Sequence, residues 1–509
     1  MTRTRRPAPP TVPPRGTPPP SAPAPARGVR ADLCAALAAV LLVVAAVVVG
    51  RRIEDADGTL FVDWPPLLAS WGPHLGPGTP AALLVAVAVV AYGPSVAARL
   101  PWRGLLAAAW ATSAAWTVSL ALIDGWQRGV AGRLTTRYEY LRAVDRFADV
   151  PATLRDFTGH ILLGTPDHWP AHVAGHPPAA TLTFVLLDRF GLGGGGWAGV
   201  WCLAVGATAA TAVLVTVRAL ADERLARRAA PFLVLAPAAV WTGTSADAYF
   251  AAVAAWTVAL LALAVTRRSP GHAAGAGLLF GLTCYLSYGL TLVAVIGGAV
   301  LWLGRARVRE RPVLPAALLG GVVVVPTVFT LAGFNWWEAY HLLVTRYYQG
   351  AGGTRPYGYW VWANLACTVL IVGLATVAGL RRSGAVLLRD NGALLSRLPE
   401  SAARPPAVGA EAGDAPGVRR RGGWARPAWA RSVRSSGAEA RLALLCAGAA
   451  LALLVADLSG MSKAETERIW LPFAVWLLPA CAALTRPRGW LLAQAVLALL
   501  INHLLRTGW

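Results

Sequence analysis

Apolar runs long enough to cross a lipid bilayer recur along almost the whole chain. A helix needs roughly 20 mostly apolar residues to cross the hydrocarbon core of a membrane. About thirteen runs come close to that length, and they cover residues 33–50, 81–98, 104–123, 196–217, 229–243, 247–266, 272–287, 289–304, 313–333, 359–380, 441–457, 468–485 and 489–505. The sequence therefore predicts an all-α fold, a polytopic transmembrane helix bundle of about 13 spans.

The amino-acid composition agrees with a membrane bundle and indicates which kinds of partner to expect. The chain is 56% hydrophobic and only 14% charged, with a mean hydropathy of +0.52, which is more apolar surface than an aqueous fold can bury. The formal net charge is +21, but the arginines lie in short segments between apolar runs, as in membrane proteins with basic cytoplasmic loops. We therefore expect membrane lipids as partners and no nucleic acid.

The charge of the connections between runs predicts the orientation of the chain. We expect a multi-pass protein of the cell (plasma) membrane with a cytoplasmic N-terminus, because most basic connections then lie inside. These connections are Arg99 with Arg103, Arg218 to Arg228, Arg267 with Arg268, Arg305 to Arg311, residues 381–440, and Arg486 with Arg488. Arg51 with Arg52 and scattered loop arginines oppose this assignment. It also requires residues 179–190 to lie in the outer interface or to re-enter rather than cross.

The remaining segments are rich in Pro, Arg, Gly and Ala. Residues 1–30 predict a disordered cytoplasmic tail. Residues 381–440 carry 11 arginines against 5 acids and predict a poorly ordered cytoplasmic linker that touches anionic lipid. Residues 31–380 then form the transmembrane bundle, with a large outer loop at 124–195, and residues 441–509 form the C-terminal transmembrane helices.

The outer loop 124–195 holds the leading candidates for a catalytic acid. Asp124 follows the end of an apolar run, and Glu139 stands between two tyrosines. A partly desolvated carboxylate at a membrane interface can act as general base for a hydroxyl nucleophile. A helix cap or a solvated loop acid is the alternative for each. Acids with arginine neighbours are second-rank candidates for which we expect surface pairing, namely Asp145, Asp149, Asp156 and Asp167.

Two histidines in the same loop are candidate substrate-binding residues. His172 and His176 precede two prolines, which stiffen the entry to the next helix, so that a histidine there can orient a phosphate or an acceptor hydroxyl. Their spacing also suggests a divalent metal pair, but it needs a helix to converge, and Gly175 argues against one. A capping role for His176 is the other alternative. The six cysteines lack paired or metal-type spacing, so we expect no disulfide, no zinc and no cofactor.

Two further outer segments contribute charged residues. Phe334 to Tyr348 is aromatic and contains Glu338 and Arg346, which suits the wall of a sugar site as well as an aromatic belt at the membrane surface.

The turn from Asp457 to Trp470 contains Lys463, Glu467 and Arg468. Arginine there can bind phosphate oxygens in a forked pair, while an internal ion pair of glutamate with arginine is the alternative.

A third outer position, the turn at Ser245 to Asp247, adds one more carboxylate, Asp247.

These features resemble the polytopic glycosyltransferases of the GT-C class that use polyprenyl-phosphate sugars, such as the protein O-mannosyl and aminoarabinose transferases. The similar stretches are Gly175 to Ala179, Leu186 to Gly191 and Ser245 to Phe250, within roughly residues 104–270. Those enzymes carry a charged residue before Pro-Pro, an interfacial helix ending near Phe-Gly and a later Asp-rich outer turn. The resemblance implies a first outer loop with juxtamembrane helices, an acid in that loop that acts as base, and basic side chains that hold the departing lipid phosphate.

The chain departs from that family at one informative place. An acid usually stands a few residues before the Arg-Tyr pair that corresponds to Arg137-Tyr138, and here those positions are Leu134, Thr135 and Thr136. The base therefore stays open between Glu139 and Asp124. Two additional runs before residue 104 also lie outside the family pattern.

The resulting hypothesis is an inverting transfer of a sugar from a polyprenyl-phosphate donor to a hydroxyl of a cell-envelope glycan, lipid or protein. An outer-loop carboxylate takes the proton, and Arg468, Lys463 or Arg346 stabilises the departing phosphate. A polytopic transporter or lipid flippase is the main alternative, although the chain shows no clear internal repeat. A non-catalytic envelope-assembly protein is a third.

Overall fold

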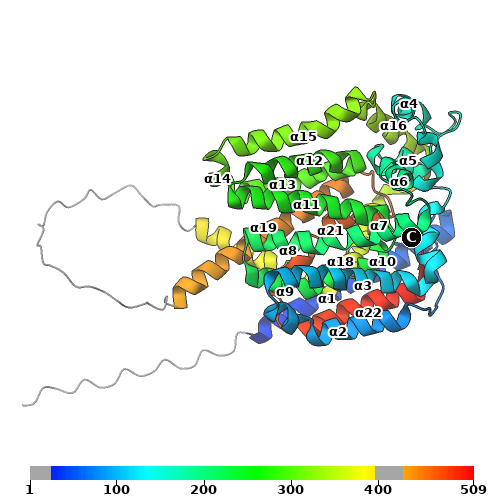
Figure 1. Cartoon of the computed structure of the whole chain (residues 1–509). Coiled ribbons are helices and arrows are strands. Elements are labelled where there is room, and N and C mark those ends of the chain that lie inside the picture. The colour runs from blue at the N-terminus through cyan, green and yellow to red at the C-terminus, as the bar shows by residue number, and fades with distance from the viewer. Residues whose placement is uncertain (1–24, 396–427, 509) are drawn as a thin grey trace, which may run out of the picture.

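The computed structural model describes residues 25–395 and 428–508, and these form a bundle of helices that run roughly side by side (Figure 1). Within the described residues, eight helical segments are long and apolar enough to cross a membrane. They are built from α1 (Pro25–Asp57), α2 (Thr79–Arg99), α3 (Trp102–Ala121) with η1 (Leu122–Asp124), α7 (Gly195–Gly206) with α8 (Thr208–Leu220), α11 (Ala246–Arg267), α15 (Val313–Leu331), α18 (Tyr357–Leu395) and α19 (Ala428–Leu458). The prediction of a polytopic helical membrane protein is confirmed.

The other five predicted runs form shorter or interrupted helices. They are α9 (Glu223–Val234) with α10 (Ala239–Thr242), α12 (Pro270–Leu286), η6 (Tyr288–Leu292) with α13 (Val293–Leu303), α20 (Thr466–Ile469) with α21 (Leu471–Ala474) and η7 (Leu478–Ala483), and α22 (Pro487–Leu504). The 17 residues of α12 rise about 26 Å, slightly less than the roughly 30 Å of the hydrocarbon core. A total of about 13 spans therefore stays a prediction.

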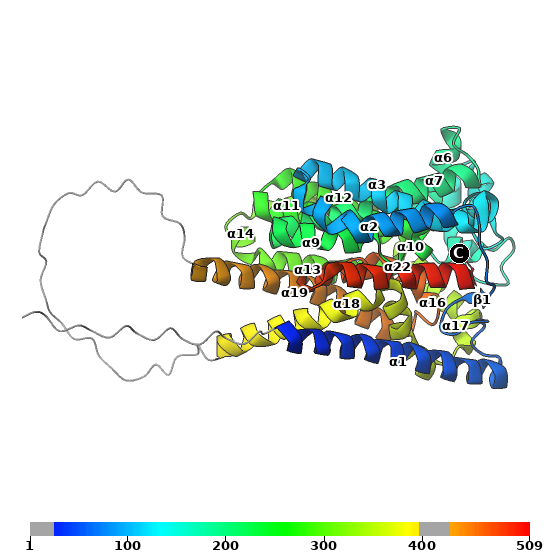
Figure 2. The ribbon, with the colours of Figure 1, turned by 90° about the horizontal axis from the view of Figure 1, so that it is seen from below.

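The two ends of the bundle differ in character (Figures 1 and 2). One end, here called the basic end, holds the connection between α8 and α9 together with the short helix α14 (Arg305–Arg309). The opposite end, here called the loop end, carries the residues between α3 and α7 and those between α15 and α18. Its elements are η2 (Gln127–Ala131), η3 (Arg133–Thr135), η4 (Tyr140–Phe147), α4 (Val150–Asp156), η5 (Phe157–His160), α5 (Ala171–Ala174), α6 (Ala179–Arg189), α16 (Trp336–Gln349) and α17 (Ala351–Thr354).

The segment 179–190 forms the short helix α6 at the loop end. Its 11 residues rise only about 17 Å, which is too little to cross a bilayer. The chain therefore enters and leaves this segment on the same side of the bundle.

A small β-ribbon also lies at the loop end, and the all-α prediction did not include it. Strand β1 (Ala69–Trp71) pairs antiparallel with β2 (Leu505–Thr507), with Ser70 opposite Arg506. Strands of three residues are too short to show the alternation of apolar and polar residues by which a strand is recognised. The ribbon joins the segment before α2 to the end of α22.

Helix α11 is the centre of the bundle, and α15 is at its edge. Buried positions make up 83% of the apolar window of α11 but only 11% of that of α15. The exposed leucines and valines of α15 are suited to contact lipid, because a helix at the edge of a membrane bundle turns apolar side chains outward.

Glycines let α15 pack directly against α12. A methyl group added at Gly277 would lie 2.0 Å from the carbonyl oxygen of Leu318, and one added at Gly321 would lie 2.2 Å from that of Ala274. Such close approach of backbones is typical of helix pairs in membranes, where packing of small residues drives association.

The first helix is fastened to α18 by a buried acid. Asp32 is 1% exposed, and its Oδ1 lies 3.0 Å from Nε of Arg381 while its Oδ2 lies 2.9 Å from Nε of Arg382. Helix α18 continues to Leu395 and α19 begins at Ala428, so both margins of the segment predicted as a poorly ordered linker are helical. Its middle part, and residues 1–24 of the predicted tail, lie outside the described residues.

Candidate functional site

Four segments that are far apart in the sequence meet at the loop end to form one polar cluster. Glu139 precedes η4, His172 lies in α5, Asp247 lies in the first turn of α11, and Arg468 lies in α20. All four are buried, with exposures of 4% to 9%. Four ionisable side chains buried together must compensate one another, because an isolated buried charge is costly. We name these four residues the acid-arginine cluster.

His172 bridges the acid and the arginine. Its Nδ1 lies 2.9 Å from Oε1 of Glu139, and its Nε2 lies 3.2 Å from Nη2 of Arg468. A guanidinium can only donate a hydrogen bond, so Nε2 must be the acceptor and the proton of the neutral ring must be on Nδ1, facing the carboxylate. The ring position is also fixed by its backbone, whose N–H donates to the carbonyl of Tyr138 at 2.9 Å.

Arg468 is surrounded by acids. Its Nε lies 3.2 Å from Oδ2 of Asp247, and its Nη2 lies 3.6 Å from Oε2 of Glu465. Asp247 is oriented by Ser245, whose hydroxyl lies 3.3 Å from Oδ2 and also accepts the Asp247 backbone N–H at 3.1 Å. The arginine is therefore held by charge from two segments, which fixes its side chain but also neutralises it in this state.

The two carboxylate oxygens of Glu139 differ in their contacts. Oε1 lies beside His172, whereas Oε2 is buried and makes no hydrogen bond within the described residues. A buried acceptor left in this way is uncommon in proteins.

His176 and aromatic rings form the wall beside the cluster. His176 donates from Nδ1 to the carbonyl of His172 at 2.7 Å, so its Nε2 is an acceptor. Burial lowers the pKa of His176 to about 4, and the ring is therefore neutral at physiological pH. The ring of Tyr140 lies 5.6 Å from that of His176 and 5.4 Å from that of Phe184. His176 can therefore accept from a hydroxyl, whereas its neutral ring offers no charge to a phosphate.

The backbone that presents Arg468 is strained. Ala464 and Glu465 have φ values of 71° and 61°, in the left-handed region that residues with a Cβ avoid. The turn is held by Asn364, which donates to Oδ1 of Asp457 at 2.8 Å and to the carbonyl of Ser462 at 2.6 Å. Strained conformations persist only where the surroundings determine them, and they are frequent at functional sites.

Asp124, the other predicted base, belongs to a different group of contacts. Its Oδ2 lies 3.1 Å from Nη2 of Arg133, and its Oδ1 lies 3.3 Å from both Nε2 of His74 and Nε of Arg128. Arg133 also donates to the carbonyl of Thr507 at 3.2 Å. Asp124 therefore connects the outer loop to the β-ribbon, and the structure does not bring it to the acid-arginine cluster.

Glu467 is buried away from the cluster as well. It is 0% exposed, its Oε1 accepts the backbone N–H of Leu68 at 2.9 Å, and its Oε2 has no hydrogen bond within the described residues. Burial raises its pKa to about 7. This acid is anchored to the segment before β1.

The remaining predicted binding residues are dispersed over the loop end. Glu338 is exposed in the first turn of α16, and Nη2 of Arg346 donates to the carbonyl of Trp169 at 3.4 Å. Lys463 donates from Nζ to the carbonyl of Gly352 at 2.9 Å. The structure thus places Lys463 and Arg346 against backbone carbonyls of neighbouring segments.

Two of the second-rank acids of the loop make contacts with residues close to them in the sequence. Asp149 caps α4 by accepting the N–H of Ala152 at 3.0 Å, and Asp156 pairs with His160 at 2.9 Å. Asp145 instead lines a cavity of about 310 Å³ together with Thr135, Leu141, Arg142, Val144, Asp188 and Gly194.

Two contributors to the site are not among the residues selected from the sequence. Glu465 lies between Arg468 and Arg355, whose Nη1 is 3.5 Å from its Oε1. Arg355 is 8% exposed and donates to the carbonyls of Leu60 and Lys463, both at 2.9 Å. Arg355 is one of several arginines in the segments predicted to lie outside, so no signal in the sequence set it apart.

The two histidines of the suggested metal pair make separate contacts, His172 with Arg468 and His176 with the carbonyl of His172. The rings of His172 and His176 are 6.5 Å apart and nearly perpendicular, at 86°. Across the residues that the structure describes, no group of three histidine, cysteine or acidic side chains is placed to hold a metal ion.

Comparisons with known proteins give no family. No family model matches the chain, and no curated protein matches it. Among solved structures, the chain is similar to the oligosaccharyltransferase of Archaeoglobus fulgidus in three states.

The complex with zinc and sulfate has 14% identity and a TM-score of 0.31, over 73% of this chain and 53% of that one. The form tethered to an acceptor peptide has 14% identity and a TM-score of 0.34, over 75% and 56%. The complex of the archaeal oligosaccharyltransferase AglB with an inhibitory peptide and a dolichol-phosphate has 14% identity and a TM-score of 0.38, over 75% and 50%. The chain spans about half the length of these enzymes.

Proposed function

We propose that this protein is an integral membrane glycosyltransferase of the GT-C type, which moves a sugar from a polyprenyl-phosphate donor to an acceptor hydroxyl at the loop end. The observation that carries the proposal is the acid-arginine cluster. It combines a carboxylate held by a histidine with an arginine from a distant segment. These are the two groups that such a transfer needs, a base for the nucleophile and a cation for the leaving phosphate.

Glu139 is the proposed general base. Its Oε1 is oriented by His172, while its Oε2 has no hydrogen bond within the described residues, so Oε2 is the atom available to an acceptor hydroxyl. The hydroxyl attacks the anomeric carbon, the bond from that carbon to the phosphate oxygen breaks, and Oε2 receives the proton. Because Glu139 is only 4% exposed, acceptor binding requires its cover to move.

Arg468 is the proposed stabiliser of the departing phosphate. A phosphate would replace Asp247 or Glu465 as its anionic partner, and a guanidinium matches phosphate oxygens in a forked geometry. Lys463 and Arg346 donate to backbone carbonyls elsewhere, so we assign the role to Arg468 alone. His176 is assigned to the acceptor, because its neutral ring offers a lone pair to a hydroxyl.

The orientation of the proposed site follows from the basic end. Basic connections face the cytoplasm in most membrane proteins, so the loop end would face the outside of the plasma membrane, with the N-terminus inside. The donor and a glycan, lipid or protein acceptor of the cell envelope would then meet on the outer surface.

The transporter alternative finds less support in the bundle. Transporters place discontinuous helices around a binding site at mid-membrane, and α18 does contain a break at Gly373, with φ 77°. Yet the side chain of Gln494 fills that break and donates to the carbonyl of Val372 at 2.9 Å. The break is therefore packed by protein.

The test is transfer of label from polyprenyl-phosphate sugars by membranes that contain the full chain. Glu139→Gln keeps the shape of the side chain but removes the base, and we expect transfer to fall about 10²- to 10⁴-fold. Asp124→Asn and the exposed Glu338→Gln serve as matched controls and should retain transfer when equal amounts of inserted protein are compared. Full transfer by Glu139→Gln, or its loss only in Asp124→Asn, would show that Glu139 is not the base.

A further inference from the structure

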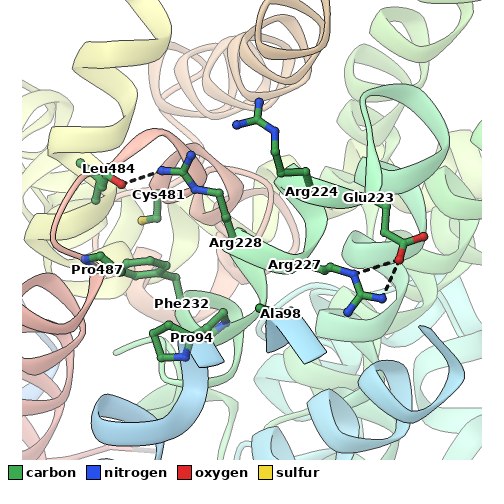
Figure 3. A pocket seen from close by; sticks show the side chains of 11 residues that line it. Pro94, Ala98, Glu223, Arg224, Arg227, Arg228, Phe232, Cys481, Leu484 and Pro487 are labelled. Carbon is green, nitrogen blue, oxygen red and sulfur yellow. Dashed lines mark hydrogen bonds and ion pairs between the residues drawn. The ribbon is translucent and has the colours of Figure 1, made fainter. Parts of the chain in front are cut away.

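The basic end contains a cavity that the transfer reaction does not use. It has a volume of about 470 Å³ and lies between α2, α9 and the segment from η7 to the start of α22 (Figure 3). Its charged lining residues are Glu223, Arg224, Arg227 and Arg228, all on α9.

Two prolines inside helices line the apolar side of the cavity. Pro94 lies inside α2 and Pro231 inside α9. The two helices are in close contact beside the cavity, because a methyl group added at Gly93 would lie 3.4 Å from Pro231. Pro94 and Pro231, together with Phe232, form the apolar floor of the cavity.

The charged residues that line the cavity are three arginines and one acid, Glu223. Only Arg227 is turned toward that carboxylate, whereas Arg224 and Arg228 point away from it (Figure 3). Arg227 is fully engaged, because Glu223 accepts from its Nε at 2.9 Å and from its Nη2 at 2.6 Å, and its Nη1 donates to the carbonyls of Ala97 and Leu100. The positive charge of the other two arginines is what remains to be compensated.

Arg224 and Arg228 carry that remaining charge. Arg224 reaches Glu439 at 3.3 Å, at an exposed pair that water screens. Arg228 donates to the carbonyl of Leu484 at 2.8 Å. Burial and then the neighbouring Arg224 lower the pKa of Arg228, while Glu439 and Asp222 oppose this shift. A ligand that brings negative charge would be favoured here.

We propose that this cavity binds an anionic phospholipid of the leaflet at the basic end. Arg224 and Arg228 would hold the phosphate, and the apolar floor of Pro94, Pro231 and Phe232 would receive the upper part of an acyl chain. The cavity is complementary to such a lipid, because its wall is cationic and its floor is apolar. It also opens at the end of spanning helices, where lipid headgroups lie. The site would be separate from the acid-arginine cluster at the loop end.

Native mass spectrometry of the full chain released from detergent tests this proposal. The probes are dioleoylphosphatidylglycerol and dioleoylphosphatidylcholine at equal concentration, and we expect the anionic lipid to be retained at least about tenfold more strongly. The double variant Arg224→Gln/Arg228→Gln should lose this preference. The matched control Arg307→Gln/Arg309→Gln removes two exposed arginines of α14 at the same end and should keep it.

A second variant separates the cavity from charge alone. Ala98→Trp fills the floor without changing any charge, and it should weaken retention of phosphatidylglycerol by a similar factor. Gel filtration verifies that each variant is folded. Equal retention of both lipids, unchanged retention in the arginine or Ala98 variants, or equal losses in the α14 control would overturn the proposal. So would displacement of the lipid by an equal concentration of glycerophosphoglycerol, because the site would then bind phosphate without an acyl chain.

Discussion

Glu467→Gln should stabilise this protein, and the stabilisation should grow as the pH rises from about 4.5 to about 7. Burial raises the pKa of Glu467 from its ordinary value of 4.5 to about 7. The folded state therefore holds the proton more tightly than the unfolded chain does. The favourable contribution of the protonated acid is present below about pH 4.5 and is lost as the pH rises through 7.

The size of the effect follows from the same two values. The pKa of Glu467 in the folded protein and its ordinary value differ by about 2.5 units, which corresponds to about 3 kcal/mol at about 1.4 kcal/mol per unit. Glutamine keeps the oxygen that accepts from Leu68 and carries no charge at any pH. The variant should nearly match the natural protein at about pH 4, exceed its free energy of unfolding by about 0.8 kcal/mol at pH 5, and exceed it by up to about 3 kcal/mol above pH 7.

The assay is thermal unfolding of both proteins in one detergent, followed from pH 5 to pH 8. The difference between their unfolding midpoints should be small at pH 5, grow up to about pH 7 and then level off. The exposed Glu338→Gln is the control and should show no such trend. Equal midpoints at pH 8, or a variant that is less stable there than the natural protein, would show that the carboxylate of Glu467 is charged and compensated in the folded state. Burial would then not penalise the charged form.

Two further substitutions test the packing and the strained turn. Gly277→Leu should separate α12 from α15, because its Cβ would lie 2.0 Å from the carbonyl of Leu318; we expect the unfolding midpoint to fall by several degrees, while Gly298→Leu, which meets open space, leaves it unchanged. Ala464→Gly should change the free energy of unfolding by less than about 1 kcal/mol, because relief of the φ of 71° is offset by loss of a buried methyl group and by the greater freedom of glycine in the unfolded chain, and a loss of more than about 2 kcal/mol in the same thermal assay would contradict this.

The parts of the fold that follow from residue-by-residue hydrophobicity were predictable, and those that depend on breaks in helices were not. Window averages find α11 because its apolar residues are continuous. They merge α20, α21 and η7 into one span, since the average does not register where the backbone turns. The β-ribbon joins residues more than 400 positions apart by backbone hydrogen bonds, for which neither side-chain pattern nor composition gives a signal.

The candidate site was predictable in its residue types but not in its grouping. Glu139, His172, Asp247 and Arg468 all stand out in the sequence as charged or polar residues in, or at the edge of, the predicted outer segments between apolar runs. Asp124 satisfies the same criterion, yet Arg133, nine positions away, takes its carboxylate to the β-ribbon. Which acid meets which cation depends on how the helices pack, and that information lies in contacts between distant segments.

The clamp between α1 and α18 constrains the order in which the protein can be assembled. Asp32 enters the membrane with the first helix, but Arg381 is made 349 residues later. At synthesis rates of about 5–20 residues per second, the acid waits on the order of 20–70 s for its cations. Until then Asp32 lacks the two arginines that enclose it in the folded bundle. The contact that fastens α1 to α18 can therefore form only late in synthesis.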